Sequence, residues 1–275
     1  MSTHLSEEIE IITSIAEQAG SILMQYFRSD VAVSYKDKKE PVTIADQKTN
    51  DCIISALSKY FPHDGIISEE QPINPSMYQY KKIWFIDPLD GTKRFIKGEE
   101  DFSIMIGRVE NGVPNLGVIF MPAKQKLYFG QAGFGAYSKT FNNYESLSAS
   151  DTSKSYTLVI SRTASEKEIE TLKQLLPITK IISISSVGVK IGKLLEHTAN
   201  LYLHLNEHTK VWDSCAPHAV YISAGGSFTD LFGNPIDYLN SEKPFNSFGL
   251  VACGSQHFQQ VIAGIRPIAE KLQLD

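Results

Sequence analysis

Long apolar runs are missing from this 275-residue sequence. No segment approaches the roughly 18 to 20 apolar residues that a membrane-spanning helix needs. The start, MSTHLSEEIEIITSIAEQAG, also lacks a basic region followed by an apolar stretch, which a secretory signal would have. We therefore predict a protein with no transmembrane segment and a cytoplasmic location.

Paired cysteines are missing as well. Cys52, Cys215 and Cys253 are odd in number, far apart and without CxxC spacing, which predicts reduced structural thiols instead of disulfides. No histidine has a cysteine pair nearby, so we do not expect a zinc site. We interpret His218 as a structural residue.

Charge of one sign does not dominate the sequence. Lysine and arginine together number 26, against 31 aspartates and glutamates, and no long block of like charge occurs. This balance gives no support for a nucleic acid polymer or a membrane surface as partner. A cationic cofactor remains possible locally, and the apolar content of 42% is enough for a sizeable core.

Apolar periodicity predicts helices and strands along the whole chain. Ser6 precedes apolar residues at helical spacing, so a long amphipathic helix opens the chain, and a second helix follows VTIAD. Residues 101–137 are expected to form three or four antiparallel strands, and beyond about residue 148 strands alternate with helices. This pattern predicts an α/β fold with α+β layers. Because no linker rich in Pro, Gly or Ser divides the chain, we expect a single unit over residues 1–275, with sub-lobes of approximately 1–148 and 149–275.

The segment WFIDPLDGTKR places two carboxylates, Asp87 and Asp90, at the end of an apolar run. A strand would put residues three apart on opposite faces, whereas a turn into a helix can aim both side chains at one point. A helix that starts at Gly91 and Thr92 would present free backbone N–H groups, which favour an anion such as phosphate. The simpler alternative is that Asp90 only caps the helix, but this leaves Asp87 unexplained.

Carboxylates stand at three other junctions. Glu69 and Glu70 follow the apolar run GIIS, Asp46 ends VTIAD, and Asp213 follows Trp212 before a helix of small residues. Taken singly, Glu69 and Glu70 could form an exposed turn, and Asp46 could be a helix cap. One divalent-cation site would explain all of them, and Mg²⁺ best matches a cluster of oxygen ligands.

With these motifs in order, the sequence resembles the lithium-sensitive, Mg²⁺-dependent phosphatase superfamily of inositol monophosphatases, fructose-1,6-bisphosphatases and 3'(2'),5'-bisphosphate nucleotidases. WFIDPLDGTKRF and WDSCAPHAVYISAGG resemble its two signatures, and EPVTIAD and SEE precede the first of them. Lys93 after DGT, together with VWDSCAP and TDLFGNPIDY, is most similar to the bisphosphate nucleotidases. The resemblance covers nearly the whole chain and implies an α-β-α-β-α sandwich.

The resemblance implies hydrolysis by a water molecule that metal ions activate. Two or three Mg²⁺ ions would be the cofactor, with Asp87 as the bridging ligand. The implied metal ligands are Glu69, Asp87, the backbone carbonyl of Leu89, Asp90 and Asp213. Thr92, hydrogen-bonded to Asp46, would orient the attacking water and help to remove its proton, so these two are the implied catalytic residues.

The same resemblance implies which residues bind the substrate. They are Gly91, Thr92, Ser161, Gly188, Lys190 and Asp213. The amides of Gly91 and Thr92 would hold the scissile phosphate, and Lys190 would help to bind the nucleotide or its second phosphate. Taken alone, Lys190 would be interpreted as a solvated charge. Ala164 departs from the family pattern, because many relatives carry histidine there.

The function that follows is removal of the 3'-phosphate from adenosine 3',5'-bisphosphate, a step of sulfur metabolism that Li⁺ would inhibit. An inositol or sugar phosphatase is the alternative with the same chemistry, and a non-catalytic Mg²⁺- or nucleotide-binding regulator is the alternative of another class. The pair of Asp46 and Thr92 favours an enzyme, because a binding protein needs no water-activating pair. We expect a monomer or homodimer, with the charged loop 36–40 covering the site.

Overall fold

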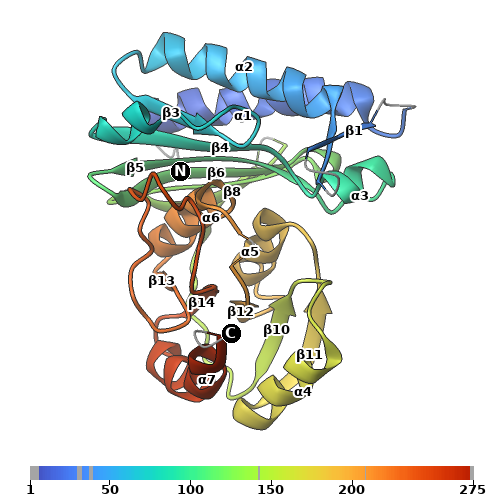
Figure 1. Cartoon of the computed structure of the whole chain (residues 1–275), viewed down its shortest axis with the longest axis vertical. Helices are drawn as coiled ribbons and strands as arrows, with labels where there is room; N and C mark the ends of the chain where they lie inside the picture. The colour runs from blue at the N-terminus through green and yellow to red at the C-terminus, as the bar shows by residue number, and fades with distance from the viewer. Residues whose placement is uncertain (1–5, 30–32, 37–39, 142, 208, 273–275) are drawn as a thin grey trace.

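The computed structural model describes residues 6–29, 33–36, 40–141, 143–207 and 209–272. Its elements stack in alternating layers of helix and sheet, with a seven-stranded sheet above a five-stranded sheet (Figure 1). From top to bottom, the helices of the three helical layers are α1 (Glu7–Tyr26) and α2 (Ile44–Tyr60), then α5 (Val187–Leu195) and α6 (Val211–Ser223), then α4 (Glu166–Leu175) and α7 (Phe258–Leu272). This order confirms the α-β-α-β-α sandwich. Among the described helices, none is long and apolar enough to cross a bilayer.

The seven-stranded sheet belongs to the first half of the chain. Its strands, in spatial order, are β3 (Gly65–Ser68), β4 (Lys82–Asp90), β5 (Ser103–Glu110), β6 (Val113–Met121), β7 (Lys126–Gln131), β8 (Gly135–Thr140) and β9 (Asn143–Leu147). β3 pairs in parallel with β4, and the other neighbouring pairs are antiparallel. The sequence pattern missed β9 because its residues are mostly exposed and lack apolar alternation.

The five-stranded sheet is mixed. Its strands, in spatial order, are β11 (Ile178–Ser183), β10 (Tyr156–Ile160), β12 (Leu201–His204), β14 (Leu250–Gly254) and β13 (Gly226–Thr229). β10 is parallel to β11 and β12, whereas β14 is antiparallel to both of its neighbours. The sequence pattern missed β14 because all its residues are buried, so it shows no alternation. A separate hairpin pairs β1 (Val33–Lys36) with β2 (Glu40–Thr43).

Helix starts follow local capping signals, with one correction. The Ser6 hydroxyl accepts the N–H of Ile9 and begins α1, as the sequence predicts. Helix α2 begins after Thr43, not at Asp46, because strand β2 ends earlier than VTIAD suggests. The Thr43 hydroxyl accepts the N–H of Ala45, and Asp46 accepts the N–H of Thr43 at 2.7 Å, which completes a capping box.

A row of glycines seats α6 on the seven-stranded sheet. Gly107, Gly117 and Gly130 are cross-strand partners on β5, β6 and β7. A Cβ atom on Gly107 would lie 2.4 Å from the backbone nitrogen of Ala216, and one on Gly117 would lie 2.6 Å from the carbonyl oxygen of Ala216. Because α6 approaches the sheet this closely, its first turn brings Asp213 next to strand β4.

Candidate active site

Asp87 and Asp90 share one face of β4 because the strand contains a β-bulge. Asp87 pairs with Met105 of β5 and Asp90 pairs with Ser103, so a step of three residues on β4 matches a step of two on β5. Residues two apart on a strand share a face, and so do their cross-strand partners. The expected turn after Asp87 was therefore wrong: the strand continues to Asp90, and the bulge aligns the two carboxylates.

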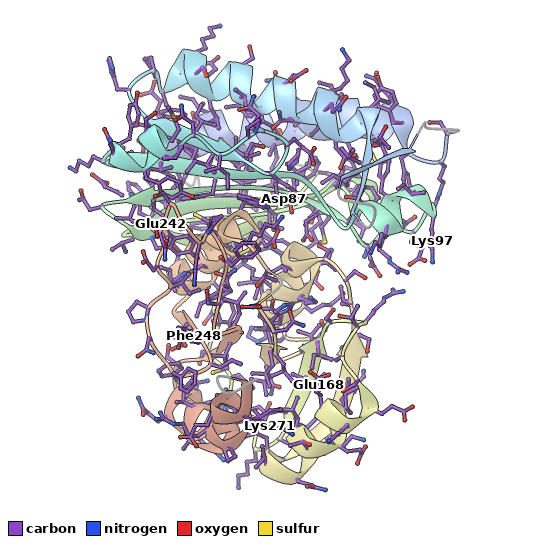
Figure 2. All side chains as sticks on the ribbon, viewed as in Figure 1. Asp87, Lys97, Glu168, Glu242, Phe248 and Lys271 are labelled. Atoms are coloured by element: carbon purple, nitrogen blue, oxygen red, sulfur yellow. The ribbon has the colours of Figure 1, made fainter. Side chains whose placement is uncertain are left out.

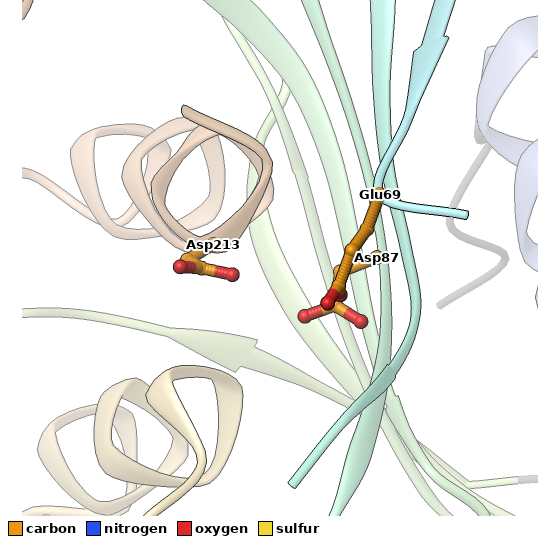
Figure 3. Close-up of side chains that lie close together, drawn as sticks. All are labelled: Glu69, Asp87 and Asp213. Atoms are coloured by element: carbon orange, nitrogen blue, oxygen red, sulfur yellow. The ribbon is translucent and has the colours of Figure 1, made fainter. Parts of the chain in front are cut away.

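Three carboxylates from separate segments converge beside this bulge. Glu69 directly follows β3, Asp87 lies on β4, Asp213 lies in the first turn of α6, and one oxygen of each lies within 4.8 Å of the others. Figure 2 places Asp87 between the sheet and the layer of α5 and α6. Figure 3 shows Glu69 just beyond the end of β3 and Asp87 on the neighbouring strand, across from Asp213 on α6. The structure thus brings together three of the predicted metal ligands.

This set of donors fits a divalent cation. Burial, and then the charges of Glu69 and Asp90, raise the pKa of both Asp87 and Asp213 well above the usual range. The carboxylates repel one another at this separation, and their oxygens are the ligands that a hard cation such as Mg²⁺ prefers. A cation bound between them would remove the repulsion that favours protonation.

Asp90 lies beside the cluster and is held by hydrogen bonds. Its Oδ2 atom accepts the hydroxyl of Ser186 at 2.6 Å, the N–H of Gly188 at 2.9 Å and the hydroxyl of Ser103 at 3.3 Å. These donors oppose the effect of burial on its pKa, which nevertheless lies above the usual value. The predicted residue Gly188 thus contacts the site through its backbone, by supporting Asp90.

Thr92 connects the bulge to Asp46. Its hydroxyl lies 3.4 Å from Oδ1 of Asp46 and 3.1 Å from the carbonyl oxygen of Leu89. The other oxygen of Asp46 accepts the N–H and the hydroxyl of Thr43, so Asp46 is both a helix cap and the neighbour of Thr92. Burial raises the pKa of Asp46 to about 6, although the Thr43 bonds oppose it. Gly91, just before α3 (Thr92–Ile96), has a φ of 102°, which glycine adopts without steric cost.

Lys190 is buried beside the same carboxylates and is not a solvated charge. Its side chain is on α5 and the residue is 1% exposed. Burial lowers its pKa to about 8, against the opposing effect of Asp90 and Asp213. Ser161, in contrast, follows β10 and its hydroxyl lies 2.9 Å from that of Thr163. The structure brings Lys190 to the acidic cluster and places Ser161 outside it.

The sequence analysis missed three polar side chains near the site. Ser186 is the N-cap of α5, a role that the serine just before VGVK could have indicated. Ser103 starts β5, and Tyr202 lies on β12. No local sequence signal marks these two, because the contact of Ser103 with Asp90 and that of Tyr202 with Lys190 depend on how the layers pack. His218 is buried as expected, with Nδ1 at 3.0 Å from the Tyr238 hydroxyl.

Comparisons with known proteins identify the family of the chain. A model of the inositol monophosphatase family matches residues 4–267. The 3'(2'),5'-bisphosphate nucleotidase CysQ of Buchnera aphidicola subsp. Acyrthosiphon pisum is 33% identical over 250 residues, which cover 89% of this chain and 92% of the relative. The protein of the same name from Escherichia coli strain K12 is 31% identical, over 86% of this chain and 96% of the relative.

Solved structures give the same result for the fold. CysQ from Bacteroides thetaiotaomicron, a bacterial member of the inositol monophosphatase family, aligns with a TM-score of 0.76 and 26% identity, over 91% of this chain and 98% of that one. The IMPase of Thermotoga maritima aligns with a TM-score of 0.80 over 97% of this chain and 100% of that one, but at 21% identity it supports the fold alone. With a family match over almost its whole length, the chain belongs to the inositol monophosphatase family.

Proposed function

We propose that this protein is a metal-dependent phosphomonoester hydrolase that removes the 3'-phosphate of adenosine 3',5'-bisphosphate and yields AMP and phosphate. The observation that carries the proposal is the convergence of Glu69, Asp87 and Asp213 from three segments far apart in the sequence. The names of the curated relatives, which align over most of their own length, support the bisphosphate nucleotide as substrate. Lys93 after the DGT segment supports the same choice.

Enzymes of this family use divalent metal ions, and the acidic cluster of this chain fits them. We assign two or three Mg²⁺ ions, with Asp87 as the bridging ligand. The assigned ligands are Glu69, Asp87, the carbonyl oxygen of Leu89, Asp90 and Asp213. When bound, the ions would offset the charge of the phosphate and lower the pKa of a bound water.

Thr92 and Asp46 are assigned to the proton of the attacking water. The Thr92 hydroxyl lies 3.4 Å from Oδ1 of Asp46, so a proton taken up at the hydroxyl can pass to the carboxylate. With a pKa of about 6, Asp46 is mostly ionised near neutral pH and can accept that proton. The strand-to-helix junction at Gly91 holds Thr92 in place for this role.

Substrate binding is assigned to two groups of residues. They are Gly91 and Thr92 for the scissile phosphate, and Ser161, Gly188, Lys190 and Asp213 for the rest of the substrate. The positive charge of Lys190 beside Asp90 and Asp213 supports a role in holding an anionic substrate. Gly188 would act indirectly, because its N–H is donated to Asp90.

A substrate panel with Mg²⁺ tests this proposal. We expect the highest kcat/KM for adenosine 3',5'-bisphosphate, with lower values for inositol 1-phosphate and fructose 1,6-bisphosphate. Negligible turnover of the nucleotide with strong turnover of another ester would replace the substrate and keep the chemistry. Absence of turnover of all three, with Mg²⁺ still bound, would favour the non-catalytic regulator.

Three further properties belong to the proposal: a cytoplasmic location, a monomer or homodimer, and a single catalytic unit over residues 1–275. One buried apolar cluster supports the single unit, because it joins Ile119 and Tyr128 of the first sheet to Val159 of the second. Limited proteolysis and light scattering test the last two properties. Residues 37–39 of the loop expected to cover the site lie outside the described residues.

A further inference from the structure

A buried asparagine on α2 is tied to the end of β3. Asn50 is 3% exposed and lies among the buried residues of α2, which include Ile53 and Leu57. An amide is costly to bury unless it is hydrogen-bonded, and a leucine would avoid that cost. The Oδ1 atom of Asn50 accepts the hydroxyl of Ser68 at 2.6 Å. This bond therefore restrains β3 against the helix.

Ser68 holds the turn that follows β3. It is the last residue of the strand and is 2% exposed. Its hydroxyl accepts the N–H of Glu70 at 3.3 Å, and its carbonyl oxygen accepts the N–H of Gln71 at 3.2 Å. These bonds close a turn in which Glu69 is the second residue. The Ser68 hydroxyl thus serves two segments, because it accepts from the turn and donates to α2.

Strand geometry directs Ser68 and Glu69 to opposite faces of the sheet. The N–H of Glu69 donates to the carbonyl oxygen of Ile86 at 3.1 Å, so the backbone still follows β4 at this residue. Successive side chains of a strand alternate between its faces. Ser68 reaches α2 on one face, and the Glu69 carboxylate lies on the other face towards Asp87 (Figure 3). A bond that fixes Ser68 against α2 therefore also fixes the direction of Glu69.

The same face of α2 reaches the other half of the site. Asp46 and Asn50 are four residues apart on the helix, so their side chains are neighbours on its surface. Oδ1 of Asp46 lies 3.4 Å from the Thr92 hydroxyl. One helix thus contacts both the proposed water-activating pair and the turn that carries Glu69.

We propose that Asn50 is a positioning residue for the cation site, because through the Ser68 hydroxyl it holds the turn that carries Glu69. The bond also sets the place of this turn relative to Asp46 and Thr92, since α2 holds both. A ligand that the protein already orients loses less conformational freedom when a cation binds, so its affinity is higher. This role rests on the cation site of the proposed function.

Alanine variants at the two ends of the bond test the proposal by isothermal titration with Mg²⁺ alone. Asn50→Ala should bind Mg²⁺ about tenfold more weakly than the parent, because Glu69 loses its support. Ser68→Ala should lose at least as much, since it also removes the acceptor of the Glu70 N–H. Adding Asn50→Ala to Ser68→Ala should change the affinity by less than about twofold, because both changes break the same link.

The matched control is Asn200→Ala, beside β10 of the second sheet. The Asn200 side chain accepts the N–H of Thr157 at 2.8 Å and donates to Asp151 at 2.7 Å. Without metal, Asn50→Ala and Asn200→Ala should both melt at least about 2 °C below the parent. Asn200→Ala should keep a Mg²⁺ affinity within about twofold of the parent, so the comparison separates a loss of stability from a loss at the cation site.

Two results would overturn the role of Asn50. Mg²⁺ affinity within twofold of the parent in Asn50→Ala would show that Glu69 needs no support from α2, and the same result in Ser68→Ala decides this if Asn50→Ala does not fold. A further tenfold loss on adding Asn50→Ala to Ser68→Ala would show that the two side chains act separately. Because no substrate is present, a parent that binds Mg²⁺ but does not hydrolyse adenosine 3',5'-bisphosphate would contradict only the proposed substrate.

Discussion

Replacing Asp87 by asparagine should stabilise the metal-free protein and abolish its response to Mg²⁺. Asp87 is 2% exposed, and oxygens of Glu69 and Asp213 lie within 4.8 Å of its own. At an effective dielectric constant of about 20, two unit charges at this separation repel each other by about 3 kcal/mol. Asparagine keeps the shape of the side chain and removes its charge, so this repulsion disappears.

The net gain should be smaller than the full repulsion, because the parent relieves part of it by binding a proton. Burial and the neighbouring carboxylates raise the pKa of Asp87 well above its ordinary value of 3.8. A raised pKa in the folded state means that the associated stability is complete below about pH 4 and is lost as the pH rises through the folded pKa. At pH 7 we expect Asp87→Asn to exceed the parent by about 1–3 kcal/mol in the free energy of unfolding, and this difference should shrink towards pH 4.

Urea unfolding in the presence of a chelator measures the first effect, and the melting temperature with added Mg²⁺ measures the second. Asp151→Asn is the matched control, because that carboxylate accepts the Ser153 N–H at 3.0 Å and the Asn200 side chain at 2.7 Å and should lose stability when neutralised. The reasoning is refuted if metal-free Asp87→Asn is less stable than the parent, or if Mg²⁺ stabilises both equally. The variant should also release no phosphate from any substrate.

Three further outcomes are expected. Hydrogen bonds from Lys126, Tyr128 and Lys193 to the carboxylate of Glu196 hold its pKa at about 2 although burial opposes them. Glu196→Gln should therefore lower the free energy of unfolding by about 1–2 kcal/mol at pH 6, measured in urea, and this difference should vanish as the pH falls from 4.5 towards 2. Gly107→Ala should cost about 1–3 kcal/mol and lower kcat/KM, because its Cβ would displace Ala216 and with it Asp213, whereas Gly133→Ala, which meets no atom within 4 Å, should leave kcat/KM unchanged. Li⁺ at millimolar concentration should inhibit phosphate release, as the family resemblance implies. Activity that stays constant over a Li⁺ titration would show that this family property does not apply to the protein.

The sequence predicts the local elements well where the pattern is strong. Helix α1 begins at the capping serine Ser6 and buries its predicted apolar face, because helical spacing and a side-chain cap are properties of a short segment. Apolar alternation fails to identify a strand when the tertiary structure buries both of its faces or exposes both. Strand β14 is buried on both faces and β9 is mostly exposed, so neither shows the alternation that identifies a half-buried strand.

The candidate site divides in the same way. The sequence by itself determined which residue types stand at the strand ends, and the motifs around Asp46, Glu69, Asp87 and Asp213, taken in order, were enough to suggest a metal-binding phosphatase. Only the tertiary structure decided how they meet. The bulge in β4 depends on pairing with β5, and Asp213 reaches Asp87 because the cross-strand glycines let α6 approach the sheet. The contact of the Ser103 hydroxyl with Asp90 likewise has no sequence signal, since hydrogen bonding between distant segments exists only once the layers have packed.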